Sequence, residues 1–245
     1  MNPVKIITGM SRGDLMKVPL PKRTDSYTPI DVSDIFDVVD TLTEKHNFTL
    51  RKEILETKRE NNQQKMRFVF DLGDSNLGFE LAILNSYDKT IAFKSGAGST
   101  AYICWNLQVM AENRFIHKHT GVVDEMVYEY LKDQFLVAED MVVKAQKKWD
   151  LYNTIELSPK QIHELVGKMV LEDDLLRAEQ FNLLRKSMKE SPIQYENLTD
   201  NSLNKLFQHT TYAIRETAPI DYFGTVNKVF KKFDEYAELI TEDYL

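Results

Sequence analysis

Residues 65–72 alternate between apolar and predominantly polar side chains, a pattern that a half-buried β-strand accommodates and a helix does not. The apolar positions are Met66, Phe68, Phe70 and Leu72. The intervening positions are Lys65, Arg67, Val69 and Asp71. Because successive side chains of a strand point to opposite faces, the segment predicts a sheet with one face on a hydrophobic core.

Further strands are expected around this one. Runs that fit strands occupy residues 48–55, 78–84 and 90–94. The polar connection 58–64 and the glycine-bounded connection 73–78 predict hairpin turns. The segment Gly96–Ser99 is expected to interrupt the strand pattern. The apolar stretch 101–110 fits either a strand or a buried helix, and its periodicity does not separate the two.

The chain is predicted to be helical after Gly121. Apolar residues recur at helical spacing from Val123 to Trp149, which predicts one helix of about 27 residues and about 40 Å. Ser158, followed by Pro159 and Gln161, has the composition of a capped helix start. Later helices are expected at about 174–190, 202–216 and 222–240.

Residues 1–30 are expected to form an extended arm, because prolines such as Pro19 and Pro21 disfavour a regular helix. Within the arm, Val4–Ile7 is apolar enough to pair as an edge strand. A short helix capped by Ser33 should follow and end near His46.

Strands followed by a run of helices indicate the α+β class. We therefore predict an antiparallel sheet of about four to five strands packed on helices, followed by a helical C-terminal region. The predicted division is an extended N-terminal arm at 1–30, an α+β sheet domain at 31–121 and a helical region at 122–245.

The composition is that of a soluble globular protein, with 42% hydrophobic and 28% charged residues. The single cysteine, Cys104, excludes an intramolecular disulfide and a multi-cysteine zinc site. The first residues do not resemble a signal peptide, and the longest uncharged stretch, 95–111, is too short and too polar to span a bilayer. We expect a cytoplasmic protein, located in the host cytoplasm if phage-encoded, that does not bind membranes.

Charge is unevenly distributed along the chain. Residues 121–245 carry 15 basic and 23 acidic side chains, whereas residues 45–120 carry 11 basic and 8 acidic ones. Two interpretations stay open. In the first, both regions have ordinary solvated surfaces. In the second, the basic middle region binds phosphate while the helices carry the excess of acidic residues.

Two segments of the middle region combine polar residues in patterns that could bind a ligand. Asn85–Thr90 fits a hairpin turn, and alternatively a polar rim beside a binding groove. Lys94–Thr100 is a glycine- and serine-containing segment that could approach a phosphate through backbone N–H groups. It lacks the residue order of a nucleotide P-loop, so it is a weak signal for a nucleotide site.

A third segment, Arg114–Gly121, contains two histidines. On a strand, His117 and His119 would project to the same side and could begin a metal site, with Asp88 as the one candidate third ligand. A basic cluster that contacts phosphate, or that orders a turn, is the alternative. We assign no metal, no cofactor and no catalytic residue.

The stretch from Leu81 to Gly121 resembles a phage and plasmid family known as domain of unknown function 932. The segments that carry the resemblance are Asn85-Ser86-Tyr87-Asp88-Lys89-Thr90, Ala111-Glu112-Asn113-Arg114 and Lys118-His119-Thr120-Gly121. The similarity in layout covers roughly residues 33–240. It implies a phage or mobile-element origin and no established activity.

The sequence departs from the family pattern at four positions. Tyr87 replaces a histidine and Ala111 a cysteine, so a metal site that used this pair could not form. Lys89 and Arg114 replace glycines. The layout is also similar to that of phage single-strand annealing proteins, in which a β-sheet and helices form an oligomer with a basic groove.

The leading hypothesis is a non-enzymatic, oligomeric phage protein that binds single-stranded DNA in recombination or replication. Its predicted phosphate contacts are Arg51, Lys52, Lys65, Arg67, Lys94, Arg114 and Lys118. Its predicted stacking residues are Tyr102 and Trp105. Its polar motif residues are Asn85, Asp88, Asn113, His117 and His119. The hypothesis requires the cations of the sheet to form one exposed strip.

Two other hypotheses stay open. The first is a phage protein–protein interaction module, either a virion component or an inhibitor of a host defence protein, with the acidic helical half as its surface. The second is an enzyme that uses Asp88, His117 and His119 in metal-assisted hydrolysis.

Overall fold

The computed structural model describes residues 6–72, 77–101, 107–190, 200–214 and 222–242. The chain divides into two compact units. The first comprises residues 1–99 and 109–142, and the second comprises residues 100–108 and 143–245. Helix α3 (Val123–Leu136), which the predicted division groups with the helical region, belongs to the first unit.

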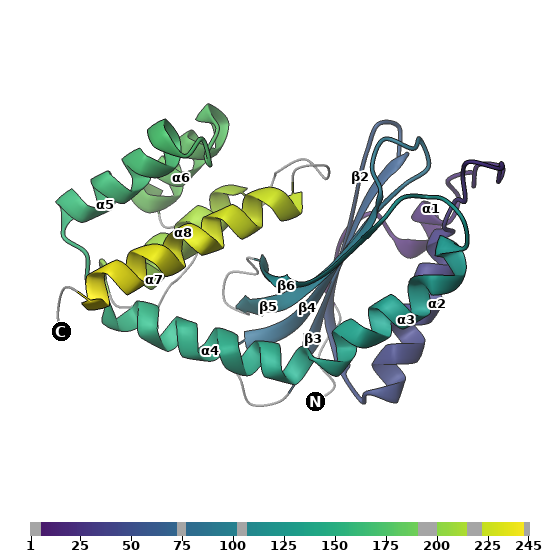
Figure 1. Ribbon diagram of the computed structural model, residues 1–245, viewed down its shortest axis with the longest axis horizontal. Helices are drawn as coiled ribbons and strands as arrows, with labels where there is room; N and C mark the ends of the chain where they lie inside the picture. The colour runs from purple at the N-terminus through teal and green to yellow at the C-terminus, as the bar shows by residue number, and fades with distance from the viewer. Residues whose placement is uncertain (1–5, 73–76, 102–106, 191–199, 215–221, 243–245) are drawn as a thin grey trace. The chain divides into compact units, whose positions relative to one another are not determined.

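A six-stranded sheet, in which the strands follow one another in sequence order, forms the centre of the first unit (Figure 1). The strands are β1 (Ile6–Gly9), β2 (Thr49–Lys58), β3 (Gln63–Asp71), β4 (Leu77–Ser86), β5 (Phe93–Ala101) and β6 (Leu107–His117). β2 pairs antiparallel with β3, and β3 pairs antiparallel with β4. The predicted α+β fold with an antiparallel sheet is confirmed, and β1 adds a parallel edge strand.

One face of this sheet packs against helix α2 (Val32–Lys45) and helix α3, which lie side by side (Figure 1). The register places Phe70 opposite Phe79, and both rings contact Phe135 of α3 at centroid distances of 5.2 and 5.5 Å. On α2, the ring of Phe36 lies 6.2 Å from that of Phe68. Aromatic pairs of this kind add about 0.5–1.5 kcal/mol beyond their burial, so the predicted apolar face of β3 is the core of this unit.

The arm contains more regular structure than the prolines suggested. β1 pairs with β2, and Gly9 makes that pairing possible because a Cβ at this position would lie 2.1 Å from the Leu55 carbonyl oxygen. A short helix, α1 (Arg12–Leu15), follows with Ser11 as its cap. The cap of α2 is Asp31 rather than the expected Ser33, because the Asp31 carboxylate accepts the Ser33 N–H.

The segment Gly96–Ser99 lies within β5 and does not interrupt it, contrary to expectation. Small side chains suit this strand because Ser95, Ala97 and Ser99 are buried, and the Gln134 amide of α3 donates to Ser95 Oγ at 2.7 Å. The backbone of Lys94–Thr100 is therefore part of the sheet and not a phosphate-binding loop. Of the undecided stretch 101–110, residues 107–110 belong to β6, and residues 102–106 lie outside the described residues.

The single long helix predicted from Val123 to Trp149 is two helices. Val137, with φ −102° and ψ 4°, leaves the helical conformation and separates α3 from α4 (Ala138–Thr154). The apolar periodicity continues across the break, which is why the sequence pattern did not reveal it. Nothing in the local sequence explains the position of the break.

The second unit is helical. After α4 come α5 (Pro159–Gly167), the π-helical turn η1 (Lys168–Glu172), α6 (Ala178–Glu190), α7 (Leu203–Ile214) and α8 (Tyr222–Glu242). The predicted capping box at Ser158 and Gln161 is confirmed. The rings of Tyr152, Phe207 and Phe233 pack together in its core. Among the described residues, no helix is both long enough and apolar enough to cross a membrane.

Candidate nucleic-acid interface

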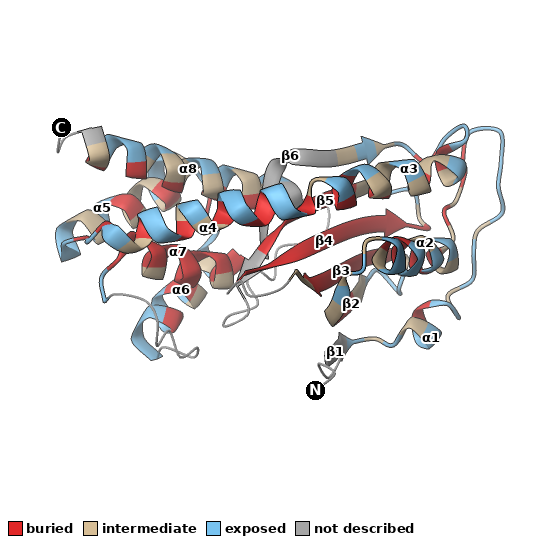
Figure 2. Ribbon diagram, turned by 90° about the horizontal axis from the view of Figure 1, so that it is seen from below, coloured by how far each residue is buried: buried red, intermediate tan, exposed pale blue. Residues whose placement is uncertain are grey.

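The predicted strip of exposed cations does not form along β2 and β3, because three of its members are paired with carboxylates. Arg67 Nε lies 2.5 Å from Glu80 Oε1, and Lys65 Nζ lies 2.9 Å from Glu56 Oε2. Both basic side chains are buried. Strand β4, which carries Glu80, is buried along its whole length (Figure 2). Arg51, which is partly exposed, lies 2.8 Å from Asp71.

The other predicted DNA-contacting residues differ in their exposure and in whether the structure describes their side chains. Lys52 and Lys94 are half-buried on β2 and β5, and Lys118 is exposed after β6. Asn113 and Arg114 lie in β6, where the structure describes the backbone but not their side chains. Tyr102 and Trp105 lie outside the described residues, so base stacking by these two residues stays a prediction.

The polar motif Asn85–Thr90 lies at the end of the sheet where the turn between β2 and β3 meets the turn between β4 and β5. The Tyr87 N–H donates to the Asn62 carbonyl at 2.8 Å and joins the two turns. Several residues of these turns have left-handed backbone conformations, with φ of 51° at Arg59, 55° at Glu60, 70° at Asn61 and 64° at Lys89. Residues other than glycine rarely adopt this conformation, so both turns carry backbone strain.

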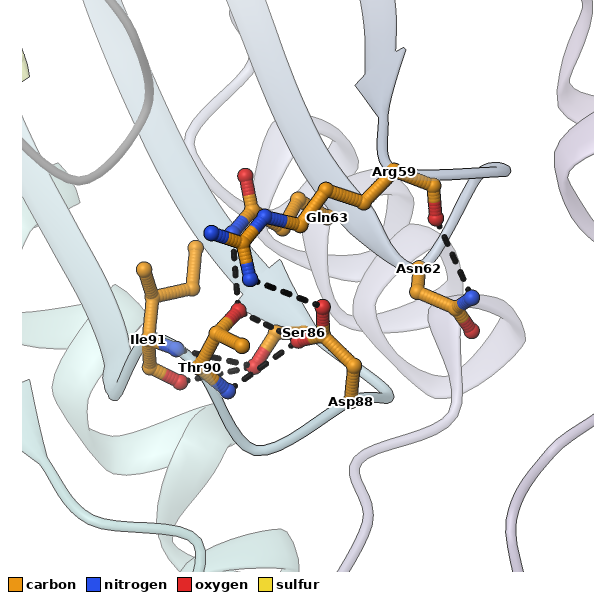
Figure 3. Close-up of polar contacts among 7 residues, drawn as sticks. All are labelled: Arg59, Asn62, Gln63, Ser86, Asp88, Thr90 and Ile91. Carbon is orange, nitrogen blue, oxygen red and sulfur yellow. Dashed lines mark hydrogen bonds and ion pairs between the residues drawn. The ribbon is translucent and has the colours of Figure 1, made fainter.

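Asp88 organises the outer layer of this junction (Figure 3). Its carboxylate accepts both the backbone N–H and the hydroxyl of Thr90, and the guanidinium of Arg59 lies 3.8 Å away. The Gln63 amide donates to the Thr90 hydroxyl at 2.7 Å. Asp88 is thus occupied by the hydrogen bonds of the turn.

Asn85 organises the inner layer, where it is fully buried. Its amide donates to Gln64 Oε1 at 2.8 Å and to the Ile30 carbonyl at 3.0 Å. Nearby, the Tyr27 hydroxyl donates to the Ser86 carbonyl at 3.1 Å. The motif therefore attaches the end of the arm to the sheet. Its side chains are used within the fold, which agrees with the interpretation of Asn85–Thr90 as a structural hairpin turn.

His119 is part of the same junction. Its backbone carbonyl accepts the Thr28 N–H at 2.8 Å, and its ring lies 5.7 Å from the ring of Tyr27. Burial lowers the pKa of His119, and the neighbouring His117 acts in the same direction. The His117 ring instead stacks on Phe115, with centroids 5.9 Å apart.

These placements do not support the alternative in which His117, His119 and Asp88 hold a metal ion. β6 ends at His117, so the two histidines do not alternate along a strand as the prediction assumed. Within the described part of the chain, no three His, Cys, Asp or Glu side chains form a group able to hold a metal ion.

Four cations project from this end of the first unit: Lys58, Arg59, Lys89 and Lys118, here called the turn-end cations. All four are exposed, and the Arg59 side chain is 62% exposed. The Lys89 ammonium lies 4.6 Å from the centroid of the Tyr27 ring, which orients it. Burial, and then the charge of Asp88, raises the pKa of Tyr27 to about 12, so the ring remains neutral beneath this cation.

Sequence reasoning selected Lys118 and missed the other three turn-end cations. The signal was available, because the polar connection 58–64 and the motif 85–90 were both recognised as turns. Their proximity could not be predicted, since it follows from the pairing of Gln64 with Asn85 across β3 and β4.

The second unit contains a different candidate site, an apolar cavity of about 530 Å³ between α5, η1 and α6. Its apolar lining includes Ile162, Val166, Phe181 and Leu184. Leu171 also lines the cavity, and its side chain is 84% exposed. Apolar pockets that open to solvent are often binding sites for protein partners or small ligands.

The sequence profile of the family described as domain of unknown function (DUF932) matches residues 19–240. No curated protein and no solved structure matched the chain.

Proposed function

We propose that this chain, which belongs to the family described as domain of unknown function (DUF932), binds single-stranded DNA through its turn-end cations. The polar motif on which the resemblance rests holds Lys89 and Arg59 at the surface. Phosphate contacts by exposed lysine and arginine supply most of the affinity of a protein that binds DNA without sequence preference. The strand cations Lys65 and Arg67 are buried beside carboxylates and are not part of this surface.

The observation that carries the proposal is the conformation of Lys89. This exposed cation occupies a left-handed backbone position, with φ of 64°. A residue with a side chain costs about 1–2 kcal/mol there, and strain of this kind tends to collect at functional positions. Arg59 is also exposed and in a left-handed backbone conformation, and its guanidinium lies 3.8 Å from the Asp88 carboxylate.

The test is fluorescence anisotropy of a labelled single-stranded oligonucleotide at two salt concentrations. Charge reversal by Lys89→Glu with Arg59→Glu is expected to weaken binding about tenfold or more at low salt. It should also reduce the slope of log affinity against log salt by about 0.7 for each lost phosphate contact.

The matched control is Lys45→Glu with Lys144→Glu, which makes the same charge change at two exposed lysines, one at the end of α2 and one on α4. Retained binding by this control, together with loss in the variant of Lys89 and Arg59, supports the turn-end surface. Absence of binding by the wild type at low salt, or equal loss in the control, would reject it.

A second candidate function, protein–protein interaction, is favoured by the cavity of the helical unit. Its lining is apolar, and the described residues leave part of it open to solvent. An apolar surface of this kind is stabilised when a partner covers it.

A further inference from the structure

The rim of the cavity carries two exposed cations. Arg185 and Lys189 are exposed and lie one turn apart on α6, so they share a face beside the apolar lining. In the described part of the structure neither of them forms an ion pair, whereas Lys186 and Lys168 pair with Glu190 and Glu164. An occupant should therefore combine an apolar side chain with nearby carboxylates.

The first unit presents a surface with this complementary chemistry. Leu136, the last residue of α3, is 63% exposed. Three exposed acidic side chains lie within four residues of it in sequence: Asp133 on α3, and Glu139 and Asp140 in the first turn of α4. Within the described residues these carboxylates form no ion pair, so their charge is available. We call this surface the acidic knob.

We propose that the cavity of one molecule binds the acidic knob of a second copy of the same chain. This proposal rests on the second candidate function, protein–protein interaction, and names the partner. Leu136 enters the apolar lining beside Phe181 and Leu184, and the knob carboxylates meet Arg185 and Lys189. Burying one leucine side chain contributes about 1.5–3 kcal/mol, and charge complementarity specifies the partner and its orientation.

The two surfaces are different, so the contact is heterologous. Each molecule that binds through its cavity still has a free knob, and each molecule that binds through its knob still has a free cavity. Assembly beyond a dimer is the expected consequence, as a closed ring or an open chain.

The experiment is sedimentation velocity of nuclease-treated full-length protein from about 1 to 100 μM, the range in which an interface of modest size associates. The wild type is expected to form oligomers that weaken as salt rises. A cavity variant, Arg185→Glu with Lys189→Glu, should be monomeric because its cavity and its knob are both acidic. A knob variant, Glu139→Lys with Asp140→Lys, should be monomeric because both of its surfaces are basic.

Mixing the two monomeric variants should restore oligomers, since the acidic cavity meets the basic knob and the acidic knob meets the basic cavity. Misfolded variants could not do this. The control Lys186→Glu changes a neighbouring charge on α6 that does not line the cavity, and it should associate like the wild type.

A wild type that is monomeric over the whole range would overturn the inference. So would variants that associate as the wild type does, or variants that stay monomeric when mixed. A monomer that carries an acyl amphiphile in native mass spectrometry would assign the cavity to a lipid instead. Because nucleic acid is removed, these outcomes are independent of DNA binding by the turn-end cations.

Discussion

Arg67 on β3 and Lys89 in the turn after β4 are both basic residues of the same unit, yet their surroundings are opposite. Arg67 is buried, 2.5 Å from a fully buried carboxylate, in a regular strand. Lys89 is exposed, lies 4.6 Å from the centroid of the neutral Tyr27 ring, and belongs to a strained turn. A buried cation paired with a carboxylate inside a sheet is not available to a ligand, whereas an exposed cation kept at a strained position is a candidate for binding.

The largest expected effect follows from breaking the buried pair. Arg67→Ala removes the cation that lies 2.5 Å from the buried Glu80 carboxylate and should lower the free energy of unfolding by about 3–5 kcal/mol. Urea denaturation of the variant and the wild type measures the difference.

The control is the double variant Arg67→Met with Glu80→Leu, which removes both charges and fills the space. It should be close to the wild type in stability. A double variant as unstable as Arg67→Ala would show that the sheet requires the charge pair itself.

The helical unit extends the comparison to a buried titratable side chain. His209 lies 2.7 Å from the Ser187 hydroxyl, and burial, followed by the charge of Lys205, lowers its pKa to about 4. The unfolded chain binds a proton near pH 6.5 and the folded chain does not, so stability should fall as the pH drops from about 6.5 to about 4. The full loss is about 3 kcal/mol, and none is expected above pH 7.5.

Urea denaturation at pH 7.5, 5.5 and 4.5 measures this dependence. Carboxylates also titrate in the lower part of the range, so the informative quantity is the difference between the wild type and His209→Gln. Parallel pH profiles for the two proteins would contradict a neutral, buried His209.

The smallest expected effect on stability is at Lys89. Lys89→Gly removes left-handed strain of about 1 kcal/mol, but it also removes the contact with the Tyr27 ring and adds freedom to the unfolded chain. These contributions nearly cancel, so the free energy of unfolding should change by less than about 1 kcal/mol. DNA affinity should nevertheless fall, as anisotropy would show.

A loss of stability at Lys89→Gly comparable to that of Arg67→Ala would mean that both cations are structural. The distinction between strand and turn cations would then disappear.

Local patterns in the sequence were enough to predict much of the secondary structure. The alternation in residues 65–72 identified β3 and its buried face, and Ser158 with Gln161 identified the start of α5. Both signals act over a few residues, through strand geometry and backbone capping. The periodicity from Val123 to Trp149 did not reveal the break at Val137, because the apolar spacing is the same on both sides.

The candidate site was predicted less well, for a physical reason. Whether a lysine or arginine is exposed depends on the carboxylate that tertiary structure places next to it. The alternation in β3 suggested that Lys65 and Arg67 face solvent. In the fold, Glu56 on the neighbouring strand β2 lies opposite Lys65, and Glu80 on β4 contacts Arg67. The charge pattern of one strand does not contain this information.

The order of elements, the α+β class and the core face of the sheet were determined by the sequence, because short-range periodicity and capping specify them. Which cations are buried with an acid and which remain exposed at the turn end was decided only by the folded chain. Strand register sets those distances, and register follows from the packing of the whole sheet against α2 and α3.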